Sequence, residues 1–309
     1  SHFADLPMDK TKGTKGMNRM NIQLIARIHE KMPDFSKGQR RIAKYIEEHY
    51  DKVAFMTASK LGATVGVSES TVVRFATEIG YSGYPELQRA MKEMIRSRLT
   101  SVQRLEITSQ NYQTSQLLSA VLNQDIDIIR RTMEETSHEA FYQAADSMLH
   151  VRKVYILGAR SSQALATFMA YYFNLIFENV QMVNCTSEAE IFEQMVNVGE
   201  EDAVIAISFP RYSRKVVKAL HFASDRKAKV IAITDSPLSP LAEPATYLVL
   251  AQSDMASFVD SLVAPLSLIN AFIVTIAIKK KAEVSQNLLR LEEIWDQYGV
   301  YEKVDDKET

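Results

Sequence analysis

Apolar residues recur at two different spacings along this 309-residue chain, and the spacing changes near residue 150. Before that point they fall three or four residues apart, which predicts helices over about Asn21–Lys31, Lys37–His49 and Pro85–Leu99, with two shorter ones inside Thr57–Gly80. Beyond it, short runs rich in Val and Ile alternate with amphipathic stretches. That alternation is typical of a parallel sheet with helices on both faces. We therefore predict an all-α domain joined to a Rossmann-like α/β domain.

The predicted strands share a short length and a high content of Val and Ile. They are Lys153–Gly158, Val180–Cys185, Ala203–Ser208, Lys229–Thr234 and Thr246–Leu250. The same pattern sets the expected boundaries, which are an N-terminal tail at 1–16, a helical domain at 17–100, a helical linker or dimer contact at 101–139, the sheet domain at 140–281, and a C-terminal helix and tail at 282–309.

The stretch Thr57–Gly80 has the spacing of a helix-turn-helix. Its apolar residues fall where two steeply crossing helices bury them against each other: Leu61, Val65, Val67, Val72 and Phe75. Gly62 is small enough to let the helices approach, and Gly66 suits the turn because a positive φ costs glycine nothing. Ser68 is expected to cap the second helix. An ordinary helical hairpin inside an all-α domain is the alternative.

Side chains on the outer face of the second helix are the candidates for contact with bases and phosphates in a major groove. The residues predicted to contact DNA are Lys60, Ser68, Glu69, Ser70, Thr71, Arg74 and Tyr84. Charge supports this prediction, because residues 17–100 hold 14 Lys and Arg against 9 Asp and Glu, whereas residues 101–309 hold 19 against 27. The basic part of the chain carries the motif, and double-stranded DNA is the expected partner.

Composition narrows the remaining classes of protein. The chain is 46% hydrophobic and 24% charged, as ordinary globular proteins are. Its single cysteine, Cys185, excludes an intramolecular disulfide and fits a reducing cytosol, and its place in a predicted strand indicates a core residue. The closest approach to a membrane span, Leu262–Ile278, is shorter than the roughly 20 residues that cross a bilayer, so a buried helix is predicted. We expect a cytoplasmic protein with no membrane segment.

Polar residues follow three of the predicted strands. Parallel strands end at one edge of a sheet, so these residues are expected to gather there and form a ligand site. The predicted effector contacts are Arg160, Ser161, Ser162, Ser208, Arg211, Ser213, Thr234 and Ser236, joined by Asp260 ahead of the long apolar helix. Hydroxyls, guanidinium groups and helix N-termini favour phosphate or another anion. For each loop alone, a strand-end serine that serves only as a helix cap is the alternative.

No cofactor is expected at these loops. The first loop has Arg160 and Gln163 where a dinucleotide site needs its later glycines, and the chain has no phosphate-binding G-x-x-x-x-G-K. The His, Cys and carboxylate residues do not show the spacing of metal ligands, so no metal is expected either.

The order of a helix-turn-helix, a helical linker and a sheet with serine-bearing loops resembles the RpiR/MurR family of bacterial transcription regulators over residues 21–281. Residues 66–75 (GVSESTVVRF) look like the family's recognition helix, and residues 80–87 (GYSGYPEL) like the turn after it. Ser162 falls on the serine of the family's G-x-G-x-S loop, and Ser208 and Ser213 fall on the outer members of its S-x-S-G-x-T loop. The resemblance implies a sugar-isomerase-type (SIS) domain that senses a phosphosugar.

Two arginines depart from the family's pattern. Arg160 replaces the second glycine of the first loop, while Pro210 and Arg211 replace the middle serine and the glycine of the second. The arginines can add bidentate contacts to an anion, which we favour, or fill the space that a sugar would use.

A sugar-phosphate isomerase with an accessory helical domain is the alternative function. It needs a general base and a general acid near the bound sugar, whereas the strand-end loops offer mainly hydroxyls and arginines. Glu188, Glu190 and Asp254 are the remaining candidates for a base. A regulator is expected to be a homodimer or homotetramer, with apolar surface supplied by Leu262–Ile278 and Ser101–Ile129, and effector binding is expected to change the spacing of its DNA-binding domains.

Overall fold

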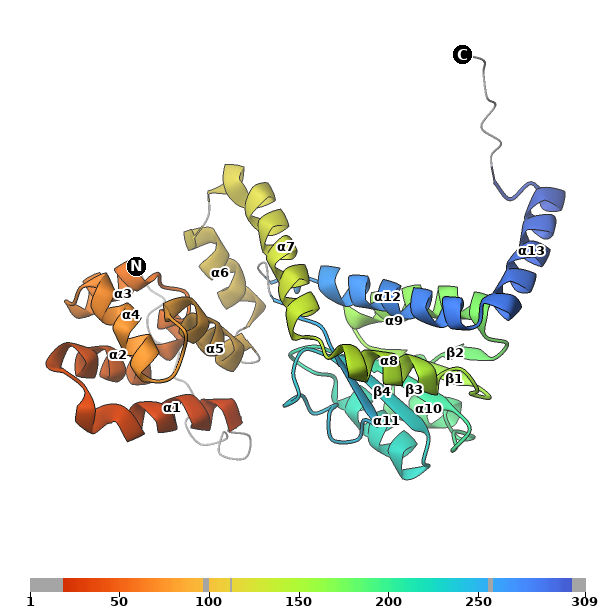
Figure 1. The fold of residues 1–309 in the computed structure, drawn as a ribbon, viewed down its shortest axis with the longest axis horizontal. Helices are drawn as coiled ribbons and strands as arrows, with labels where there is room; N and C mark the ends of the chain where they lie inside the picture. Colours follow the sequence, from red (N-terminus) through yellow and green to blue (C-terminus); the bar gives the residue numbers. More distant parts are fainter. Residues whose placement is uncertain (1–18, 97–99, 112, 255–257, 302–309) are drawn as a thin grey trace, which may run out of the picture. The chain divides into compact units, whose positions relative to one another are not determined.

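The computed structural model describes residues 19–96, 100–111, 113–254 and 258–301. The tail predicted at 1–16 and the end of the stretch predicted at 282–309 therefore lie outside the described residues. The chain divides into two compact units, Ser1–Gln103 and Arg104–Thr309 (Figure 1). The first unit is helical and the second contains a parallel sheet, which confirms the predicted fold class.

The first unit consists of short helices around one apolar core. Its elements are α1 (Arg19–Lys31), the 3-10 turn η1 (Met32–Asp34), α2 (Lys37–Val53), α3 (Ala58–Val65), α4 (Glu69–Glu78) and α5 (Tyr84–Arg96). Ser36 caps α2 in a reciprocal arrangement, because its side chain accepts from Gln39 N while the Gln39 side chain accepts from Ser36 N. The buried residues Ile42, Phe75 and Leu87 bring α2, α4 and α5 into the same core.

The second unit surrounds its sheet with helices. Before the sheet come α6 (Ser101–Asn111), the 3-10 turn η2 (Thr114–Gln116), α7 (Leu117–Glu135) and α8 (His138–Ser147). Strands and helices then alternate as β1 (Val154–Gly158), α9 (Ser162–Ile176), β2 (Val180–Met182), α10 (Glu188–Gln194), β3 (Ala203–Ile207), α11 (Arg214–Asp225), β4 (Lys229–Thr234) and β5 (Tyr247–Leu250). The chain ends with α12 (Val263–Lys279) and α13 (Lys281–Tyr298).

All five strands are parallel, in the order β2-β1-β3-β4-β5. Successive residues of a strand point to opposite faces, so Ile156 and Ile205 join a core with α8, α9 and α12, while Leu157 and Val204 join a core with α10 and α11. The two helix layers lie on either side of the strands in Figure 1. Burial on both faces explains why the strands are continuous apolar runs.

The long helix α12 is a core element. It buries Leu268, Ile269, Phe272 and Ile276, as its apolar sequence predicts. Within the described residues no single helix is long and apolar enough to cross a membrane, and α12 and α13 meet that criterion only together, across a bend of 100°.

Candidate functional sites

The helix-turn-helix has the local geometry that its glycines predict. Gly66 ends α3 in the left-handed conformation with φ +70°, and Val67 N donates to Gly62 O over 2.8 Å. A Cβ atom on Gly62 would lie 2.8 Å from Val67 O, which is closer than real Cβ atoms come. The turn that follows α3 therefore passes directly over Gly62, and only glycine permits that approach.

The second helix of the motif, α4, buries one side and exposes the other. Val72 and Phe75 are fully buried. Ser68 accepts a capping hydrogen bond from Thr71 N at 3.3 Å, and the Arg74 Nε atom donates to Ser70 O, also at 3.3 Å. The side chains that stay exposed are Lys60, Ser68, Glu69, Ser70 and Arg74, while Thr71 is half-buried. Their contact with DNA stays a prediction, and this exposed surface is available for it.

One predicted DNA contact is wrong. Tyr84 is only 4% exposed, and its hydroxyl donates to Met56 O at 2.9 Å. Burial raises the pKa of Tyr84 well above its usual value. The side chain ties the start of α5 to the segment that follows α2, so it is a core residue.

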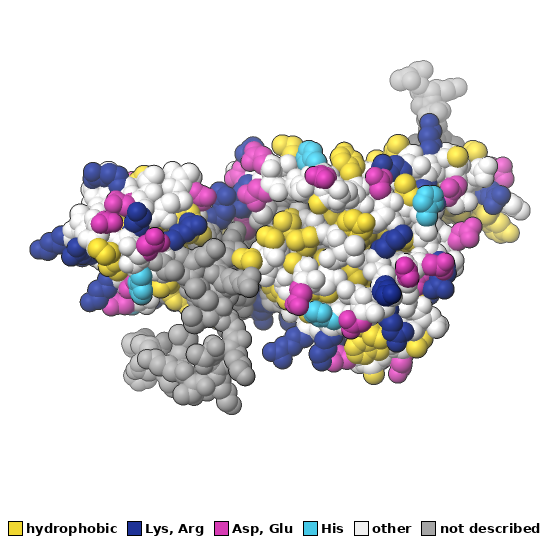
Figure 2. Space-filling view, turned by 60° about the horizontal axis from the view of Figure 1, so that its bottom comes forward, with side chains coloured by type: hydrophobic (Ala, Val, Ile, Leu, Met, Phe, Trp, Pro, Cys, Tyr) yellow, Lys and Arg dark blue, Asp and Glu magenta, His cyan; other side chains and the backbone are white. Residues whose placement is uncertain are grey.

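A basic residue that the sequence did not single out lies beside the turn. Arg41, on α2, is exposed, and its Nη2 atom donates to Gly66 O at 2.9 Å. Figure 2 shows many Lys and Arg side chains on the surface of this smaller unit. The available signal was the run of cations on α2, which is Lys37, Arg40, Arg41 and Lys44.

The second candidate site lies in the sheet unit, at the carboxyl ends of β1 and β3. These strands are neighbours, but β1 leads to β2 on one side and β3 leads to β4 on the other. The loops that leave them diverge, and such a switch point is where open α/β sheets bind their ligands. The loop after β1 carries Arg160 and Ser161, and the loop after β3 carries Arg211 and Ser213.

Both arginines at this edge of the sheet have a left-handed backbone, with φ +58° at Arg160 and φ +67° at Arg211. This conformation costs a residue with a side chain roughly 1–2 kcal/mol. Among the described residues other than glycine, Lys227 alone shares it. Both guanidinium-bearing residues are exposed, so the loops hold two cations at the edge where the family's pattern has glycine.

The helices that begin at these two loops have no side-chain caps. Ser161 stands before α9 and Ser213 before α11, and neither side chain makes a capping hydrogen bond. Ser or Thr side chains do cap α2, α3, α4, α8 and α10. In α9, Gln163 N and Ala164 N already donate to Arg160 O and Ser161 O at 3.0 and 3.2 Å, so there an anion is favoured mainly by the helix dipole. The start of α11 can also offer N–H donors.

The other predicted effector residues lie deeper. Ser162 and Ser208 are 5% and 4% exposed, and Ser208 Oγ accepts from Ser213 N at 3.3 Å. Their contact with an effector stays a prediction. The structure contradicts the effector contact predicted for Thr234. This residue is fully buried, and its hydroxyl donates to Ser239 Oγ at 2.9 Å. Ser236 Oγ accepts from Leu238 N at 3.1 Å, which makes it a turn-forming side chain that is still half-exposed.

Asp260 has a protein partner that the sequence did not indicate. Its Oδ1 atom lies 2.7 Å from Nη1 of Arg104, a guanidinium on α6 that is 1% exposed. Ser261 next to it donates to Asp125 Oδ1 on α7 at 2.6 Å. Asp254 pairs with Arg131, also on α7. The segment between β5 and α12 is thus fastened to the helices that precede the sheet, and contact of Asp260 with an effector stays a prediction.

Cys185 is half-buried beside the first loop. Its thiol donates to Val183 O at 3.6 Å, and burial raises its pKa above the ordinary value. Both observations fit a core residue. Within the described residues, no group of three or more His, Cys, Asp or Glu side chains could hold a metal ion.

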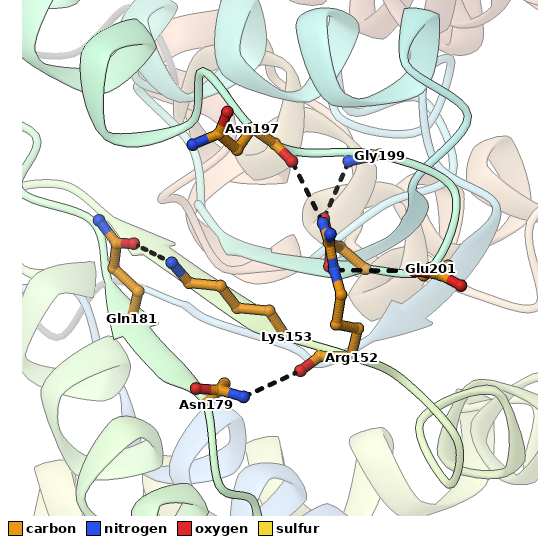
Figure 3. Close-up of polar contacts among 8 residues, drawn as sticks. Arg152, Lys153, Asn179, Gln181, Asn197, Gly199 and Glu201 are labelled. Atoms are coloured by element: carbon orange, nitrogen blue, oxygen red, sulfur yellow. Dashed lines mark hydrogen bonds and ion pairs between the residues drawn. The ribbon is translucent and has the colours of Figure 1, made fainter.

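At the opposite edge of the sheet, the polar groups are already paired. Arg152 Nε and Nη2 donate to the two carboxylate oxygens of buried Asp202 at 2.9 and 2.7 Å, and Gly199 N donates to the same carboxylate (Figure 3). These hydrogen bonds raise the pKa of Arg152. Lys153 donates to Gln181 at 2.6 Å. The network holds the start of β1 to the loop before β3, which is a structural role.

Comparisons with known proteins match each unit to a known domain family. The rpiR-family helix-turn-helix domain matches residues 22–98, and the SIS domain matches residues 147–275. The chain belongs to the RpiR family. Its relatives include HexR, an HTH-type transcriptional regulator of Escherichia coli, which is 24% identical over 281 residues, or 88% of this chain and 94% of HexR. An uncharacterized HTH-type transcriptional regulator of Caldanaerobacter subterraneus is 25% identical over 88% of this chain and 96% of its own length.

Solved structures agree with this assignment of the fold. The sugar isomerase domain of the RpiR transcription factor from Sphaerobacter thermophilus is 25% identical, covers 58% of this chain and 99% of its own, and superposes with a TM-score of 0.53. The NanR protein of Vibrio vulnificus, solved in complex with ManNAc-6P, is 20% identical over 89% of this chain and 98% of its own, with a TM-score of 0.52. The protein is an RpiR-family transcriptional regulator, which confirms the family and the regulatory function that the sequence indicated.

Proposed function

We propose that this RpiR-family regulator binds a phosphorylated sugar, or a closely related anion, at the switch point between β1 and β3, and that binding changes its affinity for operator DNA. The observation that carries the proposal is the meeting of two exposed arginines with two uncapped helix N-termini at one switch point. Arginine forms bidentate hydrogen bonds with phosphate, and the dipoles of helix N-termini favour an anion. Ser161 and Ser213 supply hydroxyls beside them.

The contacts between α6, α7 and the segment after β5 support a route for the signal. This segment leaves the same carboxyl edge at which the effector is proposed to bind. Besides Asp260, it is held through Gln252 N, which donates to Thr132 Oγ1 at 2.9 Å. The end of β5 is held in the same way, because Leu250 O accepts from Thr136 Oγ1 at 2.7 Å. An effector that binds two arrangements of this segment unequally changes the position of α6, the helix that follows the DNA-binding unit.

We propose that the protein acts as a binding protein without catalytic turnover. Two of the carboxylates that could serve as a base are engaged in ion pairs, Glu188 with Lys218 at 2.7 Å and Asp254 with Arg131. Purified protein is expected to leave sugar phosphates unchanged. Detection of aldose–ketose interconversion by NMR would favour the isomerase alternative.

A ligand screen read by thermal unfolding tests the effector proposal. Sugar phosphates are compared with the same sugars without phosphate and with inorganic phosphate. The phosphorylated sugars are expected to raise the melting temperature and to change binding to DNA from upstream of the protein's own gene. Equal shifts from phosphorylated and unphosphorylated sugars would contradict an anion site, and a shift without any change in DNA binding would contradict the regulatory coupling.

We also propose that the protein is a homo-oligomer with at least two copies. One helix-turn-helix reads a short half-site, and a symmetric pair doubles the contact with DNA. Sedimentation equilibrium measures the mass directly, and a monomer at micromolar concentration would contradict this part of the proposal.

A further inference from the structure

The last helix, α13, is covered by little of the second unit. It starts where the chain bends by 100° after α12, and Figure 1 shows it leaving the body of the unit. Of its 18 residues only Val284 is buried. The apolar side chains left exposed on α13 and just after it are Leu288, Leu289, Ile294, Tyr298, Val300 and Tyr301. A surface helix normally turns such residues toward a core, so this helix lacks the surface it fits.

Helix α7 has a second uncovered apolar face. Leu118, Leu122, Ile126, Ile129 and Met133 follow one another at intervals of three or four residues, which places them in one stripe along the helix. Their exposed fractions run from 38% at Ile129 to 74% at Leu118. The neighbouring side of α7, roughly 100° around the helix, is occupied, because Ile128 and Thr132 are buried. The stripe therefore runs nearly the whole length of the helix as an exposed apolar face.

These two faces lie at opposite ends of α12 in the same unit (Figure 1). Helix α7 lies near the start of α12, and α13 follows its end. A two-fold axis near the middle of α12 would carry the α13 helix of one copy to the α7 helix of the other, and the reverse. Such an interface is self-complementary, which is the requirement for a closed dimer.

We infer that a second copy of this chain covers both faces, with α13 of each protomer packed along the α7 stripe of its partner. A stable dimer buries roughly 1,200–2,000 Å² in total. A reciprocal exchange forms the contact between α7 and α13 twice, so helices of 19 and 18 residues can supply that area. The partner is a second copy because one chain carries both halves of the contact. The inference rests on the proposed oligomer and specifies which surfaces form it.

Charge variants of exposed positions test the pairing. Leu122→Glu with Ile126→Glu places carboxylates on α7, and Leu289→Arg with Ile294→Arg places cations on α13. Each pair alone is expected to weaken dimerisation by at least about tenfold, because charge enters an apolar contact. All four substitutions in one chain are expected to restore the dimer, since every α13 cation then meets a carboxylate of the partner's α7. Val196→Glu, at an exposed apolar residue outside both helices, is the control and should leave the mass unchanged.

Sedimentation equilibrium gives the dissociation constants, and circular dichroism verifies that each variant is folded. If the double variant of α7 and the double variant of α13 both remain dimers, the contact between α13 and α7 is overturned while the oligomer itself stands. Loss of the dimer in both double variants without recovery in the fourfold variant would also overturn this contact. A wild-type monomer at every concentration would overturn the inference together with the proposed oligomer.

Discussion

At the scale of single residues, Arg160 and Arg211 are held in a backbone conformation that suits glycine. Both have a positive φ, and both stand in loops at the proposed effector site. Residues held in this way are a common mark of functional sites. Their retention has a cost in stability that ligand contacts can offset.

Replacing each arginine with glycine separates the contribution of the backbone conformation from that of the guanidinium group. Arg160→Gly and Arg211→Gly are each expected to raise the stability of the ligand-free protein by about 0.5–1 kcal/mol, because the left-handed strain is removed while glycine adds some chain entropy. The increase in melting temperature caused by a phosphosugar should fall in the same variants. Lys227→Gly is the matched control, with φ +61° in the turn after α11, and it should stabilise the protein without changing the ligand response. A full ligand response in both arginine variants would remove these side chains from the site.

Variants of the single residue Arg74 test whether the exposed face of α4 binds DNA. Arg74→Ala is expected to weaken operator binding by about 1–3 kcal/mol, because a side chain on the exposed face of α4 is lost. Arg74→Lys keeps the charge and loses the fork of donors, so it should retain more of the affinity if phosphate is the target and little if a base is. Fluorescence anisotropy at fixed salt measures both variants, and unchanged affinity in the alanine variant would exclude Arg74 from the interface.

At the scale of elements, the crossing of α3 and α4 depends on one missing side chain. Gly62→Ala is expected to destabilise the protein by about 1–3 kcal/mol, because the new Cβ meets Val67 O at 2.8 Å, even though alanine favours helices. Gly199→Ala is the control, because no atom lies within 4 Å of the added Cβ. Urea unfolding compares the two, and a Gly62→Ala variant as stable as the wild type would show that the turn can move aside.

The sequence predicts elements better than it predicts the surroundings of single side chains. The spacing around Gly62 and Gly66 and the Val-rich runs place α3, α4 and the strands, because burial on one or two faces imposes a period on the sequence. Tyr84 and Thr234 were expected to face ligands and are buried instead. Whether a loop side chain turns inward depends on segments that fold against it, such as the carbonyl of Met56, and no local pattern records that.

At the scale of the whole molecule, the ion pair between Arg104 and Asp260 joins residues 156 positions apart. A contact of that separation leaves no periodic signal. It ties the segment before α12 to α6, so a displacement of one is transmitted to the other.

Removing one partner of this pair gives a test of coupling. Asp260→Ala is expected to lower the free energy of unfolding by about 3–5 kcal/mol, because the Arg104 guanidinium is left buried beside an apolar residue. The double variant Arg104→Met, Asp260→Leu should recover most of that stability, since no charge is left unpaired. If the pair transmits the effector signal, the double variant binds operator DNA with an affinity that no longer responds to phosphosugar. A normal response in the double variant would place the route elsewhere.

Helices α12 and α13 are joined by the single residue Lys280. Because one residue joins the two helices, a small change of angle at Lys280 displaces the far end of α13. Eighteen helical residues extend for about 27 Å, so a tilt of about 5° at the joint moves the far tip by roughly 2 Å. A rearrangement of the second unit that is too small to disturb its core therefore produces a larger displacement at the end of α13.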